Sequence, residues 1–297
     1  ILGVSMFNGI KNKMIDLELE DLHVASDYFV SEVNEEKAEL QDALLFLVEE
    51  IGSGNRFSMT LEETRIWLQR HAANAGMSNL ALFRENGRFI ASAYDDNFDA
   101  PEEKNAVKEA ASGKTVSAIV VGDNKICNSC ATTMTWGGAK FILLGESTVT
   151  SVDFLSNAVR MPETYVSIYL DKVRLGTTLN TGTNSVRLMD NNVAEEVYQG
   201  EGEYAGLIEI DGMNLLTFYH NLGMEHEDGE TGAEHGLFNK DVKVAVAVVK
   251  EFSAVKKAYT TILATSLGQT VILFGVVVGV ILVIISGSIL KPIHTAI

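Results

Sequence analysis

The chain has 297 residues, of which 46% are hydrophobic and 21% are charged, so it can bury a large core and is not a disordered polypeptide. Of its 23 Lys and Arg residues only Lys291 follows position 266, which leaves 22 basic groups against 40 acidic ones before that point. This acidic balance excludes nucleic acid as a partner, because binding phosphates requires clustered Lys and Arg. With two cysteines, the chain is also not a disulfide-framework protein.

A long helix is predicted over residues 8–51, which contain no proline. Gly52 ends it, and Thr60 with Glu63 forms a capping box for a second, shorter helix. The apolar positions of the long helix form two stripes, and the register changes from one to the other near Ser31. The first stripe would pair with a second subunit and the second would pack on the chain's own domain; alternatively, one amphipathic helix packs on one core. The stripes are Ile10, Met14, Leu17, Val24 and Tyr28, then Val33, Leu40, Leu44, Leu47 and Ile51.

The next segment has the order hairpin, helix and strands. Asn86-Gly87 is a strong hairpin signal between two apolar runs. Pro101 opens a helix that ends at Gly113. The strands predicted here are Asn79–Arg84, Arg88–Tyr94, Thr115–Val121 and Lys140–Leu144.

The same order recurs in the second half of the chain. A hairpin about Asp171-Lys172 precedes a short helix that ends at Gly200. The hairpin turns lie 85 residues apart (positions 86 and 171) and the helix-ending glycines 87 apart (positions 113 and 200). This repeat predicts two related α+β modules, joined by a helix over residues 149–160. The strands predicted in the second module are Tyr165–Leu170, Val173–Leu179, Glu203–Ile210, Asn214–Tyr219 and Val242–Val249.

A membrane span is predicted near the end of the chain. No charged residue occurs between Ala258 and Leu290, and Gly268–Leu290 provides the roughly 20 apolar residues that a transmembrane helix needs. A buried helix of a soluble protein seldom stays uncharged for so long. Because an acidic domain precedes the span, residues 8–266 are expected outside the cytoplasm. Residues 1–7 are apolar and are expected to end a first span, or else to form only the first turn of the long helix.

A long helix, two such modules and a membrane span resemble the double Cache sensor domain of bacterial receptors. The second module is similar to the Cache pattern in its hairpin with an Arg (VSIYLDKVRLGTT), its helix ending in Gly, and its strand pair ending in Tyr (GEYAGLIEIDGMNLLTFYHNL). After the span, SGSILKPIHTAI is similar to the entry of a HAMP domain. The combination is typical of methyl-accepting chemotaxis proteins. Sensor histidine kinases and membrane diguanylate cyclases use the same kind of region, so they remain alternatives.

The resemblance implies an α+β fold in which a long N-terminal helix leads into two PAS-like antiparallel-sheet modules and then a C-terminal transmembrane helix. It implies a multi-pass protein of the inner membrane with no catalytic activity, no cofactor and no metal. The expected partners are a small-molecule ligand, membrane lipid, a second copy of the chain in a homodimer, and cytoplasmic signalling proteins. The expected domains are the first span (1–7), two helices (8–78), the distal module (79–148), a linker helix (149–162), the proximal module (163–257), stalk and second span (258–290) and the start of HAMP (291–297).

A Cache module holds its ligand between the sheet and a covering loop, so the resemblance implies ligand contacts from four distal residues. These are Tyr94, Asp95, Thr135 and Trp136. Alternatively, Trp136 packs in the core and Asp95 serves a turn. Amino-acid-binding members carry an Arg for the ligand carboxylate shortly before a Trp. Here Met134 lies two residues before Trp136, which does not favour an amino acid as ligand.

In the proximal module Arg174, Tyr204 and Tyr219 match the Cache pattern and would hold an anion through charge-assisted contacts. As strand residues they are equally explained by structural roles. Cys127 and Cys130 are expected to form a tight disulfide that staples a loop, since the segment is exported. A redox-responsive pair and half of a zinc site are the alternatives.

His220, His226 and His235 lie in a stretch rich in Glu, Asp and Gly (HNLGMEHEDGETGAEHG). Such a stretch would collect a divalent cation, which makes a membrane-anchored extracellular metal-dependent enzyme the alternative from another class. A solvated loop explains the same residues. The sequence contains neither Gly-x-Ser-x-Gly nor His-Glu-x-x-His, so no common hydrolase motif supports the enzyme.

Overall fold

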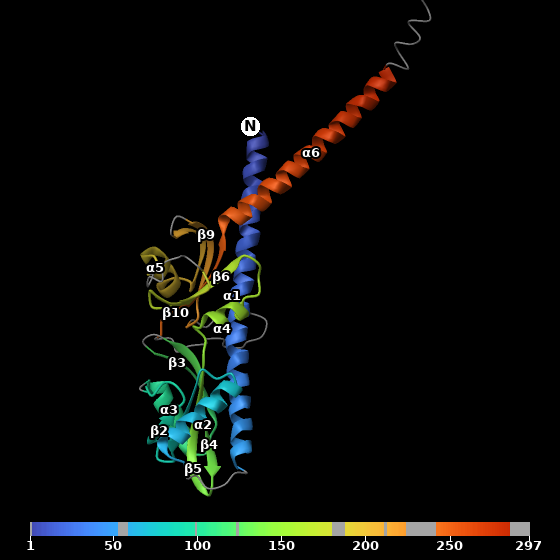
Figure 1. The fold of residues 1–297 in the computed structure, drawn as a ribbon. Helices are drawn as coiled ribbons and strands as arrows, with labels where there is room; N and C mark the ends of the chain where they lie inside the picture. The colour runs from blue at the N-terminus through green and yellow to red at the C-terminus, as the bar shows by residue number, and fades with distance from the viewer. Residues whose placement is uncertain are drawn as a thin grey trace, which may run out of the picture. The chain divides into compact units, whose positions relative to one another are not determined.

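The computed structural model describes residues 2–52, 59–98, 100–122, 125–179, 188–210, 213–223 and 242–285. The chain divides into two compact units, one of residues 1–18 and 251–297 and the other of residues 19–250. The larger unit holds both sheets and most of the long helix (Figure 1).

Helix α1 (Leu2–Gly52) confirms the predicted long helix. Its second apolar stripe is buried as expected; Leu44, for example, is 0% exposed. The first stripe is not part of the core, since Val24 is 51% and Tyr28 68% exposed. Leu22, Ala25 and Phe29 face inward instead.

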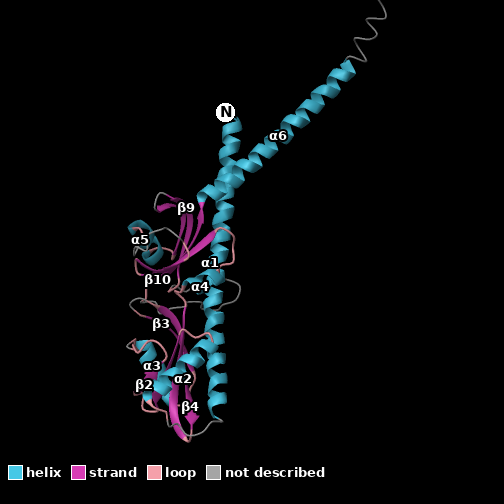
Figure 2. Ribbon diagram, in the orientation of Figure 1, coloured by secondary structure: helices cyan, strands magenta, loops and turns pink. Residues whose placement is uncertain are grey.

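The distal module contains one antiparallel sheet, whose strands are magenta in Figure 2. Its strand order is β2-β1-β5-β4-β3. The predicted hairpin is confirmed, and Gly87 adopts the left-handed φ of +78° that its turn requires. Strand β4 was not predicted: both of its faces are buried, so it lacks the alternation of apolar and polar residues that marks a half-buried strand. The strands are β1 (Asn79–Arg84), β2 (Phe89–Ser92), β3 (Val116–Val121), β4 (Ile126–Trp136) and β5 (Ala139–Thr148).

Helices cover both faces of the distal sheet. On one face the sheet packs against α1 and α2 (Leu61–Asn74) through a large apolar cluster. The other face packs against α3 (Pro101–Ala111). The predicted capping box of α2 is confirmed, because Thr60 N donates to the Glu63 carboxylate at 2.7 Å and Glu63 N donates to Thr60 Oγ1 at 3.3 Å.

The proximal module repeats the same topology, with the strand order β7-β6-β10-β9-β8. The predicted repeat is therefore confirmed, because the first, second, third, fourth and fifth strands of each module occupy matching places. Helix α4 (Val152–Ala158), which precedes it, is shorter than the predicted 149–160. The other elements are β6 (Thr164–Leu170), β7 (Val173–Thr177), α5 (Asn191–Gln199), β8 (Glu203–Ile210), β9 (Met213–Asn221) and β10 (Val244–Glu251).

The two first hairpins share an irregularity. In the distal hairpin the register shifts between Leu82 and Phe83, and in the proximal hairpin it shifts between Ile168 and Tyr169. Because both hairpins have this shift, the residues of the two modules can be aligned on it. They match Phe83, which pairs with Phe89, to Tyr169, which pairs with Arg174.

The smaller unit contains α6 (Phe252–Ile285), whose apolar residues are exposed over much of its length. Within the described ranges, no helix has a stretch both long and apolar enough to cross a membrane. The predicted span Gly268–Leu290 continues past Ile285, so part of it lies outside the described residues. Residues 291–297, the predicted start of HAMP, also lie outside them.

Candidate functional site

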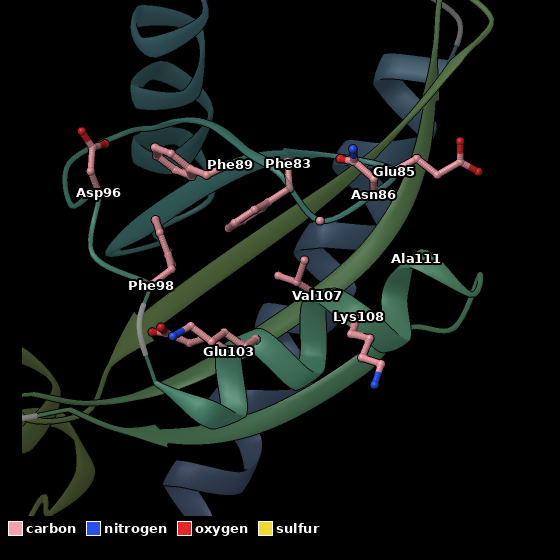
Figure 3. Close-up of a pocket in the computed structure, with 12 residues that line it drawn as sticks. Phe83, Glu85, Asn86, Phe89, Asp96, Phe98, Glu103, Val107, Lys108 and Ala111 are labelled. Atoms are coloured by element: carbon pink, nitrogen blue, oxygen red, sulfur yellow. The ribbon is translucent and has the colours of Figure 1, made fainter.

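A pocket of about 570 Å³ lies in the distal module between the first hairpin, the segment that follows it and α3 (Figure 3). Its wall is aromatic: the rings of Phe83, Phe89 and Phe98 point toward one another, with centroids 5.5 to 5.6 Å apart. The hairpin sets this arrangement, since Phe83 and Phe89 are direct cross-strand partners. Val107 of α3 lies against the same space. The pocket thus offers an apolar surface of the kind that binds small molecules.

The pocket is charged at both ends. Asp96 and Glu103 lie at one end, and Glu85 and Lys108 at the other (Figure 3). Glu103 differs from the rest because its side chain is only 2% exposed. It accepts a hydrogen bond from the backbone N–H of Ala100 at 3.3 Å, at the start of α3. The sequence therefore places a carboxyl group at the first turn of this helix and the fold buries it.

Glu103 meets a second buried carboxyl, Glu146 of β5, which is 1% exposed and hydrogen-bonded to it. Asn79 Nδ2 donates to Glu146 at 3.0 Å. Lys125 Nζ lies 3.3 Å from the Glu146 carboxylate and 3.1 Å from that of Asp95. We call Glu103, Glu146, Lys125 and Asp95 the charged cluster. It contains three carboxyl groups and one ammonium group in and beside the sheet face that α3 covers.

Ser129 adds an unusual polar atom to this face. It lies directly opposite Glu146 in the pairing of β4 with β5. Cys127, two residues earlier on β4, donates to Glu146 at 3.5 Å, so Ser129 points to the same face of the sheet. Ser129 is 0% exposed, and its hydroxyl has no hydrogen-bond partner in the described part of the chain. A buried hydroxyl without a partner is costly, so its presence calls for an explanation.

The cluster shifts the pKa of its members. Burial, together with the hydrogen bond and charge of Glu146, raises the pKa of Glu103 to about 7, although Lys125 and the Ala100 N–H oppose this. Burial lowers the pKa of Lys125, but Glu146, Cys127 and Asp95 outweigh it and raise that pKa, so Lys125 stays charged. Burial and the charge of Glu146 raise the pKa of Cys127, so its thiol stays protonated and is a poor nucleophile. Glu103 is therefore the cluster member that can change charge near neutral pH.

The distal residues predicted from the sequence do not come together. Asp95 joins the charged cluster: burial raises its pKa, but the Asn97 N–H and Lys125 outweigh this and lower it. Tyr94 is 60% exposed. Thr135 and Trp136 lie at the opposite end of β4, which at about 3.3 Å per residue is roughly 30 Å away. Trp136 is 6% exposed and its ring packs 4.9 Å from that of Trp67 in the core cluster, as the alternative reading of the sequence has it.

The proximal residues do come together. Arg174 pairs with Tyr169 across β7 and β6, and Tyr204 pairs with Tyr219 across β8 and β9. The three tyrosines belong to the apolar cluster that packs against α5, and we call them the tyrosine row. The rings of Tyr169 and Tyr219 are 5.8 Å apart, and those of Tyr204 and Tyr219 are 6.1 Å apart. Burial and Tyr169 raise the pKa of Tyr219, whereas Arg174 works to lower it. Tyr169 was not singled out in the sequence.

The disulfide predicted between Cys127 and Cys130 is wrong, because both cysteines are free and buried. They lie on β4 rather than in a loop. Residues three apart on a strand point to opposite faces, and their Cα atoms are roughly 10 Å apart, which is beyond the reach of a disulfide. Cys127 faces Glu146, whereas Cys130 belongs to the core cluster under α1.

The predicted histidine-rich stretch is described only in part. His226 and His235 lie outside the described residues. His220 is 7% exposed on β9, and its Nδ1 lies 3.1 Å from Ser26 Oγ of α1. Among the described residues there is no group of three or more His, Cys, Asp or Glu side chains that could hold a metal ion.

No protein-family model and no curated protein matches this chain. Its fold is similar to that of the sensory domain of the Campylobacter jejuni chemoreceptor Tlp3, with 11% identity over 83% of this chain and 98% of that one and a TM-score of 0.46. It is similar to the ligand-binding domain of the Pseudomonas fluorescens chemoreceptor CtaA in complex with L-isoleucine, with 15% identity over 84% and 98% of the two chains and a TM-score of 0.43.

A third solved structure is the extracellular domain of rpHK1S-Z16, described as a candidate histidine kinase, with 12% identity over 82% of this chain and 95% of that one and a TM-score of 0.42.

The residues that sequence reasoning missed are Glu103, Glu146, Lys125 and Ser129. One signal was available: Glu146 is a charged residue close behind an apolar strand run, FILLG, and such a charge is rarely buried without a partner. Glu103 gave no such signal, because a Glu in the first turn of a helix is common as a cap. Only the fold shows that the two carboxyls meet.

Proposed function

We propose that this chain is the ligand-sensing region of a transmembrane receptor and that it binds a small molecule in the distal pocket. The observation that carries the proposal is Glu103, a buried carboxyl that lines the aromatic pocket and meets Glu146, which in turn pairs with Lys125 behind the pocket lining. Burying charges costs free energy, and perturbed titratable groups in a cleft are typical of functional sites. An apolar pocket with a few converging polar groups is the usual form of a ligand site.

Contacts of α1 support a route for the signal. Asn128 of β4 donates through Nδ2 to the backbone carbonyl of Val33 at 3.0 Å. On the same helix, Ser26 is hydrogen-bonded to His220 of the proximal sheet. A ligand that shifts β4 would therefore act on the helix that also contacts the proximal module. Small helix shifts of this kind are a known means of signal transfer in receptors and allosteric proteins.

A thermal-shift screen of the chain against a broad metabolite panel tests the pocket. We expect at least one compound to raise the melting temperature, and Val107→Trp, which fills the pocket, to abolish that rise. Ala111→Trp is a second blocking variant in case Val107→Trp folds poorly. The matched control is Ile66→Trp, an exposed position of α2 outside the pocket lining. If no compound stabilises the chain, or if the blocking variants respond like the wild type, the proposal fails.

Two other residue sets are part of the proposal. Asp95 would act indirectly by holding Lys125 in the charged cluster. Arg174, Tyr204 and Tyr219 would hold a small anion in the proximal module. The closeness of Arg174 to the tyrosine row supports this second role. Replacing Arg174 with Gln should abolish binding of such an anion without affecting ligands of the distal pocket, as measured by calorimetry.

We propose that Gly268–Leu290 crosses the inner membrane, that residues 8–266 lie outside the cytoplasm, and that residues 1–7 end a first span. The charge-free apolar sequence supports this. Alkaline phosphatase, which is active only after export, provides the test. Inserted at the turn of Gly138 it should be active, and fused after Ile297 it should be inactive. Activity at both places would contradict the topology.

We also propose a homodimer that pairs through α1. Val24 and Tyr28 are apolar, exposed and on the stripe that the chain's own core does not use. Tyr28→Cys should give a cross-linked dimer under mild oxidation, whereas Phe46→Cys, exposed farther along α1, serves as the control. A Tyr28→Cys variant that stays monomeric would contradict the pairing.

The proposed output is that of a chemoreceptor, continuing from residues 291–297 through HAMP. A histidine kinase or a diguanylate cyclase is the alternative, and we assign no catalytic role to the chain itself. Fusing the 297 residues to the cytoplasmic half of a chemoreceptor should give a response to the compound found in the thermal-shift screen. No response from that fusion, together with a response from a kinase fusion, would favour the alternative.

A further inference from the structure

We propose that the pair Glu103 and Glu146 makes occupancy of the distal pocket depend on protons, because a ligand with an ammonium group takes the place of the proton that the two carboxyls share. The inference rests on the function proposed above and adds the ligand's charge and its regulation. It starts from geometry: the two side chains come from different elements, α3 and β5, and meet where both are almost completely buried.

Charge balance requires either a proton or a second cation at this place. Two carboxylates in contact cannot both ionise unless a positive charge lies between or beside them. Lys125 is 3.3 Å from Glu146 but also 3.1 Å from Asp95, so it neutralises at most one of these groups. Glu103 is left to hold a proton or to meet another cation. Its raised pKa, about 7, agrees with this geometry.

Ser129 supplies an independent observation that points to a ligand. Its hydroxyl is fully buried, has no partner among the described residues and faces the charged cluster beside Glu146. An ammonium group has three N–H donors and no acceptor. Glu103 on α3 lines the pocket, and Glu146 and Ser129 lie behind it on the sheet face that α3 covers, so an ammonium group that displaces the shared proton would meet three acceptor groups. The unpartnered hydroxyl is thus explained as the third contact of an ammonium ligand.

The aromatic part of the pocket suits the rest of such a ligand. Phe83, Phe89 and Phe98 form an apolar wall next to Glu103 (Figure 3). Aromatic faces attract cations and bury apolar substituents. The ligand class is therefore a small organic amine with an apolar or aromatic body. When it enters as R–NH₃⁺, Glu103 releases its proton to solvent, and the net charge of the site is unchanged.

Other titratable and charged groups line the pocket or lie beside Glu103. Asp96 at the pocket end is paired with Arg65 of α2 at 2.8 Å. Cys127 stays protonated. The remaining charged groups of the pocket are Lys104 and Lys108 on α3 and Glu85 on the hairpin.

Calorimetry on the whole chain tests the proposal, in a mild detergent because α6 exposes apolar side chains. The probes are a series of primary amines led by 2-phenylethylamine, the matched alcohols and the matched carboxylates. Titrations in two buffers of different ionisation enthalpy count the protons released. At pH 6 we expect close to one proton released for each amine bound. The dissociation constant should fall about tenfold between pH 6 and pH 8, as linkage to one group of pKa near 7 requires.

Variants identify the group responsible. Glu103→Gln should abolish proton release and the pH dependence and weaken amine binding at pH 8 by about tenfold or more, since a charge-assisted hydrogen bond is lost. Glu109→Gln, an exposed position on the same helix, should behave like the wild type. Ser129→Ala should weaken binding by about 2- to 12-fold with proton release unchanged.

The proposal is overturned if alcohols or carboxylates bind and no amine does, if amines bind without proton release, or if Glu103→Gln keeps the pH dependence. These outcomes leave the proposed sensing function standing, provided that Val107→Trp still blocks the compounds that bind. If nothing in any panel binds, the sensing function itself fails.

Discussion

The distal and proximal modules have the same strand order and the same hairpin irregularity, yet the faces that α3 and α5 cover differ in chemistry. Aligned on that irregularity, Asn79 opposite Glu146 in the distal sheet corresponds to Tyr165 opposite Val249 in the proximal sheet. A buried carboxyl in one module thus stands where the other has an apolar side chain. Phe83 and Phe89 of the pocket wall likewise correspond to Tyr169 and Arg174.

The difference shows which features belong to the fold and which to the site. The proximal sheet has the same topology as the distal sheet, but among its described residues it lacks the charged cluster. The cluster is therefore not needed to form a sheet of this topology. The proximal row of tyrosines fills the space under α5 with rings, whereas the distal face leaves a pocket and retains charges. We infer that the distal face is specialised for the proposed amine ligand, whereas the proximal face is packed with rings and could admit only a small anion beside Arg174.

The largest effect is expected when a carboxyl is placed in the proximal sheet. Val249 is 3% exposed in an apolar cluster, so Val249→Glu would bury a carboxylate without a cationic partner. We expect the free energy of unfolding to fall by about 3–5 kcal/mol at pH 7, and by less below pH 5, where the carboxyl takes up a proton. Urea unfolding measures this. Val249→Ile is the control and should change stability by less than about 1.5 kcal/mol.

The second prediction concerns how stability depends on pH in the distal sheet. The pKa of Glu103 is about 7 in the folded chain and 4.5 ordinarily, so the folded state holds a proton that the unfolded state releases. The extra stability is complete below pH 4.5 and is lost as pH rises to about 7, by roughly 2–3 kcal/mol. Glu103→Gln should remove this loss. Unfolding of both proteins at pH 5 and pH 8 tests it, and parallel curves would contradict it.

A smaller effect is expected in the tyrosine row. The Tyr219 hydroxyl is hydrogen-bonded to Tyr169, and Tyr219 is 2% exposed. Tyr219→Phe should lower stability by about 1 kcal/mol, the usual net value of a buried hydrogen bond. Tyr94→Phe in the exposed distal segment is the matched control, with an expected change below about 0.5 kcal/mol. Equal effects at the two sites would argue against a packed proximal row.

The smallest change in stability is expected for Ser129→Ala, which tests whether the Ser129 hydroxyl has a structural partner. Because its hydroxyl already lacks a partner, Ser129→Ala should leave stability unchanged within about 0.5 kcal/mol or increase it slightly. Ser167→Ala in the proximal sheet is the comparison, since Ser167 is hydrogen-bonded to Thr177 at 2.7 Å and should lose about 1 kcal/mol. A clear loss of stability in Ser129→Ala would mean that the hydroxyl has a structural partner.

Most of the fold could be predicted from the sequence where local signals are strong. The Asn86-Gly87 turn, the capping box at Thr60 and the apolar run of β10 each determine an element by themselves. Strand β4 could not be predicted, because Asn128 and Ser129 are buried polar residues that look like loop residues in the sequence. Their burial depends on α1 and α3 covering both faces of the sheet.

The site was predicted less well, because it depends on contacts between distant segments. Asp95 was identified by its place after a strand, but its partner Lys125 comes from 30 residues later in the chain. Glu103 and Glu146 are 43 positions apart and meet only through packing of α3 on β5. The proximal residues Arg174, Tyr204 and Tyr219 were found because hairpin and strand positions on one face fix their proximity.

The placement of the two cysteines on opposite faces of β4 affects how the chain folds in an oxidising compartment. Before β4 forms, Cys127 and Cys130 are three residues apart on a flexible segment, and their thiols can meet and oxidise. Once β4 has paired with β3 and β5, the sulfur atoms point away from each other and are shielded from oxidants. Under the proposed topology, sheet pairing and thiol oxidation would therefore compete during export, because a bond between the two thiols is incompatible with their places on opposite faces of β4.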